Sequence, residues 1–245
     1  MSIAEKFEKI TDAVYEKGKK DEYDKFWDNF QDYGNRKAYG TYLFYGKKWN
    51  DGTFYPKYDL TLTDNCLGVF NANAVTNIKQ RLIDCNVKLN TSGATNLTSI
   101  FNQSKTTTVP AFDVRNAPNS THLFYSASQL VTIDKIILNE NNVFSNWFHS
   151  CFKLENLTIE GTIGKNEFDV KDCTKLSGKS IVSIIEALAT TTEGLTVTLS
   201  QTAVNNIKFT DYDDEGFECL HGKEGTYYSW DQLAQSRTNW TISLV

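Results

Sequence analysis

One short stretch combines two residue types that are often used in nucleophilic catalysis and in metal binding. In NVFSNWFHSCFKLENLTI, residues 142–159, His149 stands two residues before Cys151. A cysteine thiolate beside a histidine base is the arrangement of a nucleophile, and the same side chains are common zinc ligands. Either chemistry needs further groups that the stretch itself does not contain, so the surrounding pattern must decide between a site and packing.

A second stretch with a chemical pattern is the acidic loop DYDDEGFECLHGKE, residues 211–224. The residues that imitate the first half of a calcium loop are Asp211, Asp213, Glu215 and Gly216. A calcium loop needs a bidentate glutamate at its twelfth place, which here is Gly222. Solvated carboxylates are the simpler interpretation, and Cys219 with His221 leaves a weaker transition-metal alternative open. We expect no metal and no cofactor.

The composition of the 245 residues limits the class of protein. Hydrophobic residues make up 40% and charged residues 22%, which is typical of a soluble folded chain. The formal charge of −5 argues against nucleic-acid binding, which needs a concentrated basic face. We see no secretory signal at the start and no run of 18 apolar residues, so we expect no export and no membrane span. A cytoplasmic or phage-particle location is the resulting expectation.

The five cysteines form neither a metal-binding nor a disulfide pattern. They are odd in number, and no two are spaced as C-x-x-C. This excludes a zinc framework of the common kind and a disulfide scaffold.

The centre of the chain repeats one pattern. Phenylalanine returns in similar surroundings at positions 70, 101, 124 and 148. A short apolar pair precedes each one: Tyr58/Leu60, Val87/Leu89, Phe112/Val114 and Ile136/Leu138. A further apolar residue follows eight or nine places later: Ile78, Val109, Ile133 and Leu157. Each unit therefore predicts a short strand, a polar turn and two anchors, which bury a core only when the units stack. The longest interval contains AVTNIKQRLIDCN, which is spaced as a helix.

The repeat gives a structural interpretation of the opening stretch. Cys151 occupies the place three residues after the phenylalanine, where the other units have Asn73, Ser104 and Ala127. This place favours a small residue, and cysteine packs as a small hydrophobe. His149 occupies the variable place one residue after the phenylalanine and is expected to be exposed. We therefore assign no catalytic residue and expect no enzyme activity.

The units resemble BspA-like leucine-rich repeats, in which an aromatic residue is followed by a small residue and then by leucine or isoleucine. FHSCFKLENLTI is the closest match and FYSASQLVTIDKI the next, and the resemblance extends from Tyr58 to about Gly161. It implies an α/β leucine-rich-repeat solenoid with short parallel strands. The whole chain is also similar to uncharacterised proteins of gut Firmicutes and their prophages, which suggests a surface or phage-tail setting.

The two ends differ from the repeats and are expected to cap the exposed core of a solenoid. Residues 1–57 predict helices over about 2–17 and 21–35, followed by an aromatic segment, and residues 58–165 carry the repeats. Residues 166–245 predict a strand over LTVTL, a short helix and last strand in WDQLAQSRTNWTISLV, and before them a helix whose apolar stripe consists of Ile181, Ile184, Ile185 and Leu188. The predicted fold thus has a helical N-terminal cap and a helix-strand C-terminal cap.

The expected function is non-enzymatic recognition of a protein or glycan through the repeat surface. Exposed aromatic residues are frequent contact residues, and the candidates are Tyr42, Tyr45, Trp49 and Tyr55, together with His149. Packing of these tyrosines and the tryptophan against the N-terminal cap is the competing interpretation. The alternative function is a structural or host-recognition component of a phage-like particle, with oligomers formed through the N-terminal helices.

Overall fold

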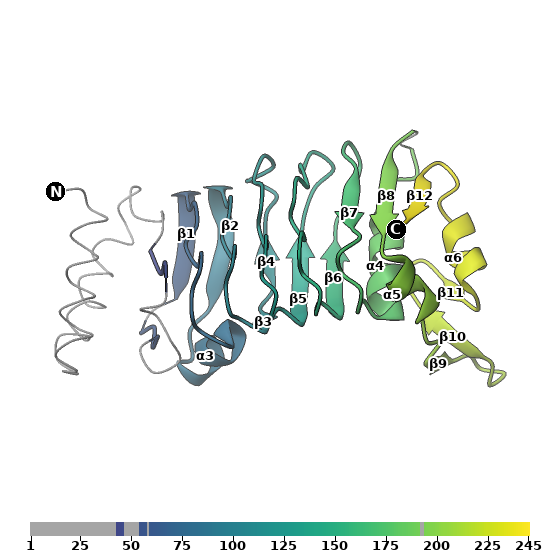
Figure 1. Ribbon diagram of the computed structural model, residues 1–245, viewed down its shortest axis with the longest axis horizontal. Coiled ribbons are helices and arrows are strands. Elements are labelled where there is room, and N and C mark those ends of the chain that lie inside the picture. The colour runs from purple at the N-terminus through teal and green to yellow at the C-terminus, as the bar shows by residue number, and fades with distance from the viewer. Residues whose placement is uncertain (1–42, 47–53, 58, 192–193) are drawn as a thin grey trace.

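The computed structural model describes residues 43–46, 54–57, 59–191 and 194–245, and these form an elongated stack of short units (Figure 1). The predicted N-terminal helices lie outside the described residues. The strands are β1 (Leu60–Asn65), β2 (Leu89–Asn96), β3 (Thr108–Val109), β4 (Phe112–Asp113), β5 (Thr132–Ile137), β6 (Asn156–Glu160), β7 (Phe168–Val170), β8 (Thr196–Leu199), β9 (Asp211–Tyr212), β10 (Glu218–His221), β11 (Thr226–Tyr227) and β12 (Thr241–Leu244). The helices are α3 (Ile78–Asp84), α4 (Gly178–Ala187), α5 (Gln201–Asn205) and α6 (Trp230–Gln235).

A column of stacked phenylalanine rings runs through the core. The rings belong to Phe44, Phe70, Phe101, Phe124 and Phe148. Neighbouring centroids are 5.2 to 5.7 Å apart with interplanar angles of 1° to 22°, and all five side chains are buried. Phe112 packs its edge against Phe101 and Phe124. The repeated phenylalanine is therefore confirmed as the internal anchor, and Phe44 adds a unit that the sequence pattern did not reveal.

The polar turns around these rings have a second regularity. Residues two before and two after the phenylalanine have positive φ, between 50° and 87°: Gly46, Gly68, Ala72, Ser99, Gln103, His122, Ser126, Asn146 and Ser150. In the units of Phe70, Phe101 and Phe124, the phenylalanine and these two neighbours donate their backbone N–H groups to carbonyls of the next unit, with N···O distances of 2.7 to 3.0 Å, and Phe44 and Gly46 do the same in the first unit. Alternation of left-handed residues with residues of negative φ thus turns all these donors toward the C-terminal side of the stack.

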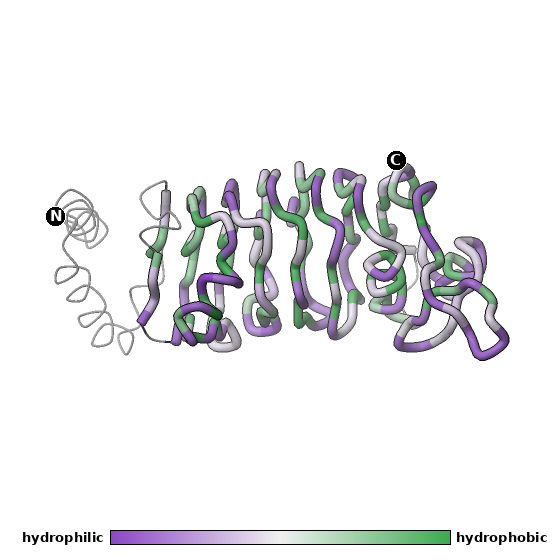
Figure 2. Tube along the Cα trace, turned by 90° about the horizontal axis from the view of Figure 1, so that it is seen from below, coloured by the Kyte–Doolittle hydropathy of each residue, from purple (hydrophilic) through white to green (hydrophobic). Residues whose placement is uncertain are grey.

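The strand register follows the predicted anchors. Leu60 pairs with Leu89 in the parallel sheet β1–β2. Val109 of β3, Ile133 of β5 and Leu157 of β6 are paired in turn, again in parallel. Helix α3 confirms the helical insertion in the first long interval. Figure 2 shows hydrophobic and hydrophilic residues alternating along successive units, as expected when every unit contributes to one core.

The prediction of an α/β leucine-rich-repeat solenoid is wrong. The described strands form four separate small sheets instead of one continuous parallel sheet, and the sheet β11-β10-β9 is antiparallel. No helix lies between α3 and α4 in the chain order of the described residues. The reason is the left-handed polar residues in the turns, because a right-handed helix needs consecutive residues of negative φ.

Side-chain hydroxyls form hydrogen bonds with the backbone at two places where a sheet ends. Thr91 Oγ1 accepts a hydrogen bond from the Asp113 N–H at 2.7 Å and donates to the Asp113 carbonyl at 2.8 Å, between β2 and β4. At the edge of β6, the Leu157 N–H donates to Ser180 Oγ at 2.9 Å, and the Ile159 N–H donates to a second serine of α4 at 2.8 Å. Because these hydroxyls satisfy groups that a neighbouring strand would otherwise bind, the sheets can stop inside the stack.

The C-terminal third combines a parallel and an antiparallel sheet. Strands β7, β8 and β12 pair in parallel, which confirms the predicted strand over LTVTL and the last strand. Helices α4 and α6 confirm the two predicted helices. The polar segment between β8 and α6 forms α5 and the antiparallel sheet, neither of which was predicted. Buried Arg237 ties these parts together, because its guanidinium donates to the carbonyls of Glu186 and Leu188.

Candidate functional site

One residue of each stacked unit forms a column along the turn edge of the molecule. We call this the turn-edge column: Tyr45, Asn71, Asn102, Tyr125 and His149. Each directly follows a stacked phenylalanine. The carbonyls of the last four members accept the N–H of the residue two after the previous phenylalanine, at 2.7 to 3.0 Å. Tyr45 is 54% exposed and the His149 side chain 44%, whereas the three middle members are half-buried. The backbone is therefore the same at every position, whereas the side chains differ.

The C-terminal half of the column forms a run of rings. The Tyr125 ring lies 4.9 Å from the His149 ring and 5.3 Å from the ring of His122, measured between centroids. His149 Nδ1 is 2.9 Å from a carboxylate oxygen of Asp172, and the same oxygen accepts the Ser150 N–H at 2.7 Å. The ordered backbone N–H groups of the units point toward the C-terminal side of the stack. The Asp172 carboxylate lies on that side, where a negative charge is favoured.

Cys151 is not arranged as a nucleophile. Its side chain is buried, and its Sγ lies 3.2 Å from the Phe124 carbonyl oxygen, to which it donates. Burial raises the pKa of the Cys151 thiol to about 12, so the thiol stays protonated at neutral pH. Asn73 has the same place in its unit and donates its Nδ2 to the Phe44 carbonyl at 2.7 Å. In both units, the residue three places after the phenylalanine therefore links its unit to the preceding one through a side-chain hydrogen bond.

Two of the five predicted surface residues lie in one column. Tyr45 and His149 are its first and last members, separated by three intervening units. Tyr55 lies elsewhere, with the Arg81 guanidinium carbon 4.1 Å from the centre of its ring, and is 45% exposed. Tyr42 and Trp49 fall outside the described residues. Of the described candidates, Tyr45 therefore shares a column with His149 and Tyr55 does not.

The carboxylates of the acidic loop, residues 211–224, accept hydrogen bonds from the protein itself. Asp211 forms an ion pair with Lys179 at 2.7 Å and accepts the His221 N–H at 3.1 Å. Asp213 Oδ1 accepts the N–H groups of Glu215 and Phe217 at 3.0 and 2.8 Å. Within the described part of the chain, no group of three or more His, Cys, Asp or Glu side chains is arranged to hold a metal ion.

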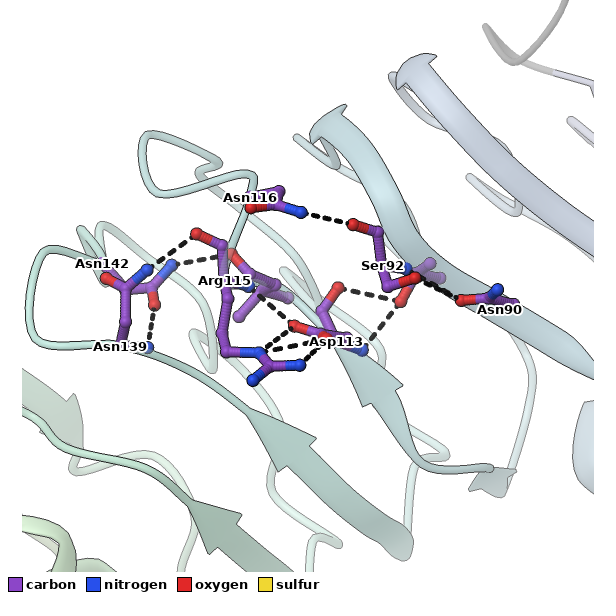
Figure 3. A network of polar contacts seen from close by, with 9 residues as sticks. Asn90, Ser92, Asp113, Arg115, Asn116, Asn139 and Asn142 are labelled. Atoms are coloured by element: carbon purple, nitrogen blue, oxygen red, sulfur yellow. Dashed lines mark hydrogen bonds and ion pairs between the residues drawn. The ribbon is translucent and has the colours of Figure 1, made fainter.

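A network of asparagines and one ion pair connects β2, β4 and the following turns (Figure 3). Asn116 and Asn139 donate their side-chain amides to the carbonyls of Ser92 and Arg115, each 24 residues earlier. Arg115 Nη2 lies 2.7 Å from an Asp113 carboxylate oxygen. Partial burial raises the pKa of Asp113, but the hydrogen bonds and charge of Arg115 outweigh it and hold the pKa below its ordinary value. The network joins neighbouring units, and its polar groups bind one another.

A polar cleft of about 570 Å³ lies between α4, the turn after β6 and the loop after β10. The Glu186 carboxylate lines this cleft. It accepts hydrogen bonds from the N–H groups of Lys223 and Glu224 at 2.6 and 2.8 Å and from the Tyr227 hydroxyl at 3.0 Å. A Cβ atom at Gly222 would lie 2.0 Å from that carboxylate. Because the Glu186 carboxylate is already bound by the loop itself, we assign no ligand to the cleft.

Sequence reasoning missed Tyr125 and Asp172 as neighbours of His149, and His122 as a neighbour of Tyr125. The place of Tyr125 one residue after a phenylalanine carried a usable signal, since it is equivalent to that of His149. The contact with Asp172 had none, because a residue 23 positions away is brought near only by the geometry of the next unit.

Comparison of the chain with protein-family models gives no match. Comparison with the curated proteins and with the solved structures gives none either. The resemblance to BspA-like repeats therefore stays a prediction that depends on the residues alone. Among the described residues, no helix has both the length and the apolar character that a bilayer crossing requires.

Proposed function

We propose that this protein is a non-enzymatic recognition module that binds a protein or a glycan through the turn-edge column. The observation that carries the proposal is the contrast between two adjacent columns. The inner column consists of phenylalanine in all five units, whereas the turn-edge column has tyrosine, asparagine, asparagine, tyrosine and histidine in the same backbone geometry. Side chains at such positions can vary without disturbing the core, which suits recognition.

The chemistry of the column supports this role. Tyrosine and histidine offer rings with a polar edge, and the half-buried Asn71 amide offers both donors and an acceptor. The backbone hydrogen bonds hold these groups in a fixed row, so little conformational entropy is lost when a ligand binds. An extended ligand that contacts several units is the kind that such a row fits.

The non-enzymatic part of the proposal is supported by the cysteines. Burial raises the pKa of Cys151 to about 12 and that of Cys66 to about 11. The structural-component alternative depends on helices at residues 2–35, which lie outside the described residues, so it stays a prediction.

The test is a screen of the labelled full chain on two arrays, one of immobilised glycans and one of immobilised peptides. We expect a reproducible ligand on one array, with its signal reduced at least about tenfold by Tyr45→Ala and by Tyr125→Ala, a range typical of contact residues. Tyr212→Ala is the matched control, because Tyr212 is an exposed tyrosine on a different sheet. Signals that are equal for all four proteins would count against the column, and thermal melts would confirm that each variant is folded.

A further inference from the structure

A second group of exposed aromatic side chains lies outside the turn-edge column, in or next to the antiparallel strands β9, β10 and β11. Tyr212 and Phe217 are each 60% exposed, and Tyr228 is 46% exposed. Apolar rings of this size are costly to leave in water, and Phe217 and Tyr228, which both contact Asp213, mark an interaction surface. The strands that carry them project from the C-terminal end of the stack (Figure 1). We call this surface the aromatic hairpin: residues 211–218 with Tyr228.

One carboxylate holds the aromatic hairpin in shape. Asp213 Oδ1 accepts the Phe217 N–H at 2.8 Å, and Asp213 Oδ2 accepts the Tyr228 hydroxyl at 2.9 Å. The Asp213 N–H in turn donates to the Phe217 carbonyl at 3.1 Å. On the adjoining ladder, Tyr212 lies directly opposite Glu218, and because side chains alternate between the two faces of a strand pair, the Tyr212 ring is on the other face of the hairpin from Phe217. The Phe217 backbone and the Tyr228 side chain are therefore held by the same carboxylate, which orders this face of the hairpin before any partner arrives.

The negative charge of the aromatic hairpin favours a positively charged partner. Residues 211–218, DYDDEGFE, contain five acidic residues and no basic residue. Asp211 is neutralised by Lys179, but Asp213 is bound only by backbone N–H groups and a tyrosine hydroxyl, which leave its negative charge in place. Asp214, Glu215 and Glu218 are exposed beside the rings. Tyrosine and phenylalanine faces attract lysine and arginine side chains, and the carboxylates add to that attraction.

We propose that the aromatic hairpin is a docking surface for a cationic, arginine- or lysine-bearing segment of a partner protein. The rings bury the aliphatic stems of the basic side chains and contact their charged groups, and the surrounding carboxylates pair with those groups. An anionic partner, such as a nucleic acid or a phosphorylated glycan, is repelled by the same carboxylates. This surface is separate from the turn-edge column, so the two proposals succeed or fail independently.

The test uses the full chain and a fluorescein-labelled octapeptide of alternating arginine and glycine, followed by fluorescence anisotropy. We expect saturable binding that weakens at least about fivefold between 50 and 300 mM NaCl, since exposed charges are screened by salt. Phe217→Ala with Tyr228→Ala, and Asp214→Asn with Glu215→Gln, should each weaken binding at least about tenfold. The same peptide with citrulline in place of arginine should not bind.

Matched controls separate a specific surface from attraction to an acidic protein. Phe152→Ala removes an equally exposed ring from another unit, and Glu167→Gln removes an exposed carboxylate. Both should leave the affinity unchanged. Binding that survives loss of the hairpin rings, or that falls equally in the Glu167→Gln variant, would overturn the proposal. Tighter binding of the citrulline peptide or of a neutral glycan would also overturn it, and Tyr125→Ala should have no effect on the arginine peptide.

Discussion

His149 and Asp172 meet at the end of the backbone ladder, with His149 Nδ1 2.9 Å from an oxygen that also accepts the Ser150 N–H. In every earlier unit the equivalent N–H binds a carbonyl of the next unit. Asp172 therefore replaces the missing carbonyl, and His149 adds a second contact to the same oxygen. The histidine that first suggested catalysis with Cys151 instead helps to close a structural ladder, and its exposed ring remains part of the turn-edge column.

Replacing Asp172 tests this end contact. Asp172→Ala leaves the half-buried Ser150 N–H without its acceptor and should lower the free energy of unfolding by about 1–2 kcal/mol, measured by urea denaturation. Asp172→Asn keeps one acceptor oxygen and should lose less. Glu167→Ala, at an exposed position nearby in the chain, is the control and should change stability by less than about 0.5 kcal/mol. Equal stability of the Asp172→Ala and Glu167→Ala variants would show that the contact is not needed.

The phenylalanine column should dominate the stability of the stack. Phe124 contacts the rings of Phe101, Phe112 and Phe148 and is buried. Phe124→Ala should therefore lower the free energy of unfolding by about 3–5 kcal/mol. Phe152 is 50% exposed, so Phe152→Ala should change it by less than about 0.5 kcal/mol. Chemical denaturation of the two variants measures the difference, and a small loss for Phe124→Ala is the result that speaks against the column.

Gly161 is required by both its conformation and its surroundings. Its φ is +108°, and an added Cβ would lie 2.0 Å from the Leu138 carbonyl oxygen. Gly194 has φ +75° with open space around it, so it separates the two effects. Gly194→Ala should lose about 1–2 kcal/mol from the unfavourable dihedral alone. Gly161→Ala should lose a further 1–3 kcal/mol, roughly, because the clash is with backbone. Thermal or urea unfolding that ranks the variants in the opposite order would contradict the packing described.

The ion pair in the asparagine network predicts a pH dependence. The pKa of Asp113 is held below its ordinary value in the folded protein, so this group stabilises the fold above pH 3.8 and the stabilisation is lost as the pH falls through the folded pKa. Arg115→Gln should therefore lower stability at pH 7, and its difference from the wild type should shrink at pH 2.5. Lys171→Gln removes a similarly spaced but exposed pair with Asp169 and should have a smaller effect. Urea titrations at the two pH values check both variants.

The sequence predicted the repeated anchors well because burial constrains them directly. Phe70 to Phe148 and the anchors Val109, Ile133 and Leu157 must be apolar in any stacked arrangement, so their spacing survives in the sequence. Phe44 was missed because it lies in an aromatic segment where many residues look like anchors. The C-terminal antiparallel sheet was missed because its strands are two to four residues long and mostly polar.

The fold class was predicted wrongly for a different physical reason. The pattern of apolar residues predicts which side chains are buried, but it does not predict the backbone dihedral angles of the polar residues between them. Ser99, Gln103 and Ser126 adopt positive φ although each has a Cβ, because the ladder of hydrogen bonds to the next unit stabilises that conformation. The contact between His149 and Asp172 depends on the same ladder, so it too could not be predicted from spacing.

The central claim is that the turn-edge column binds a ligand. The most direct measurement is isothermal titration of the ligand identified on the arrays into wild type, Tyr125→Ala, Tyr45→Ala and Tyr212→Ala, with thermal melts as the check on folding. We expect the first two variants to bind at least about tenfold more weakly than wild type and Tyr212→Ala to bind equally well. Unchanged affinity in both column variants would contradict the claim, whatever the result for Tyr212→Ala.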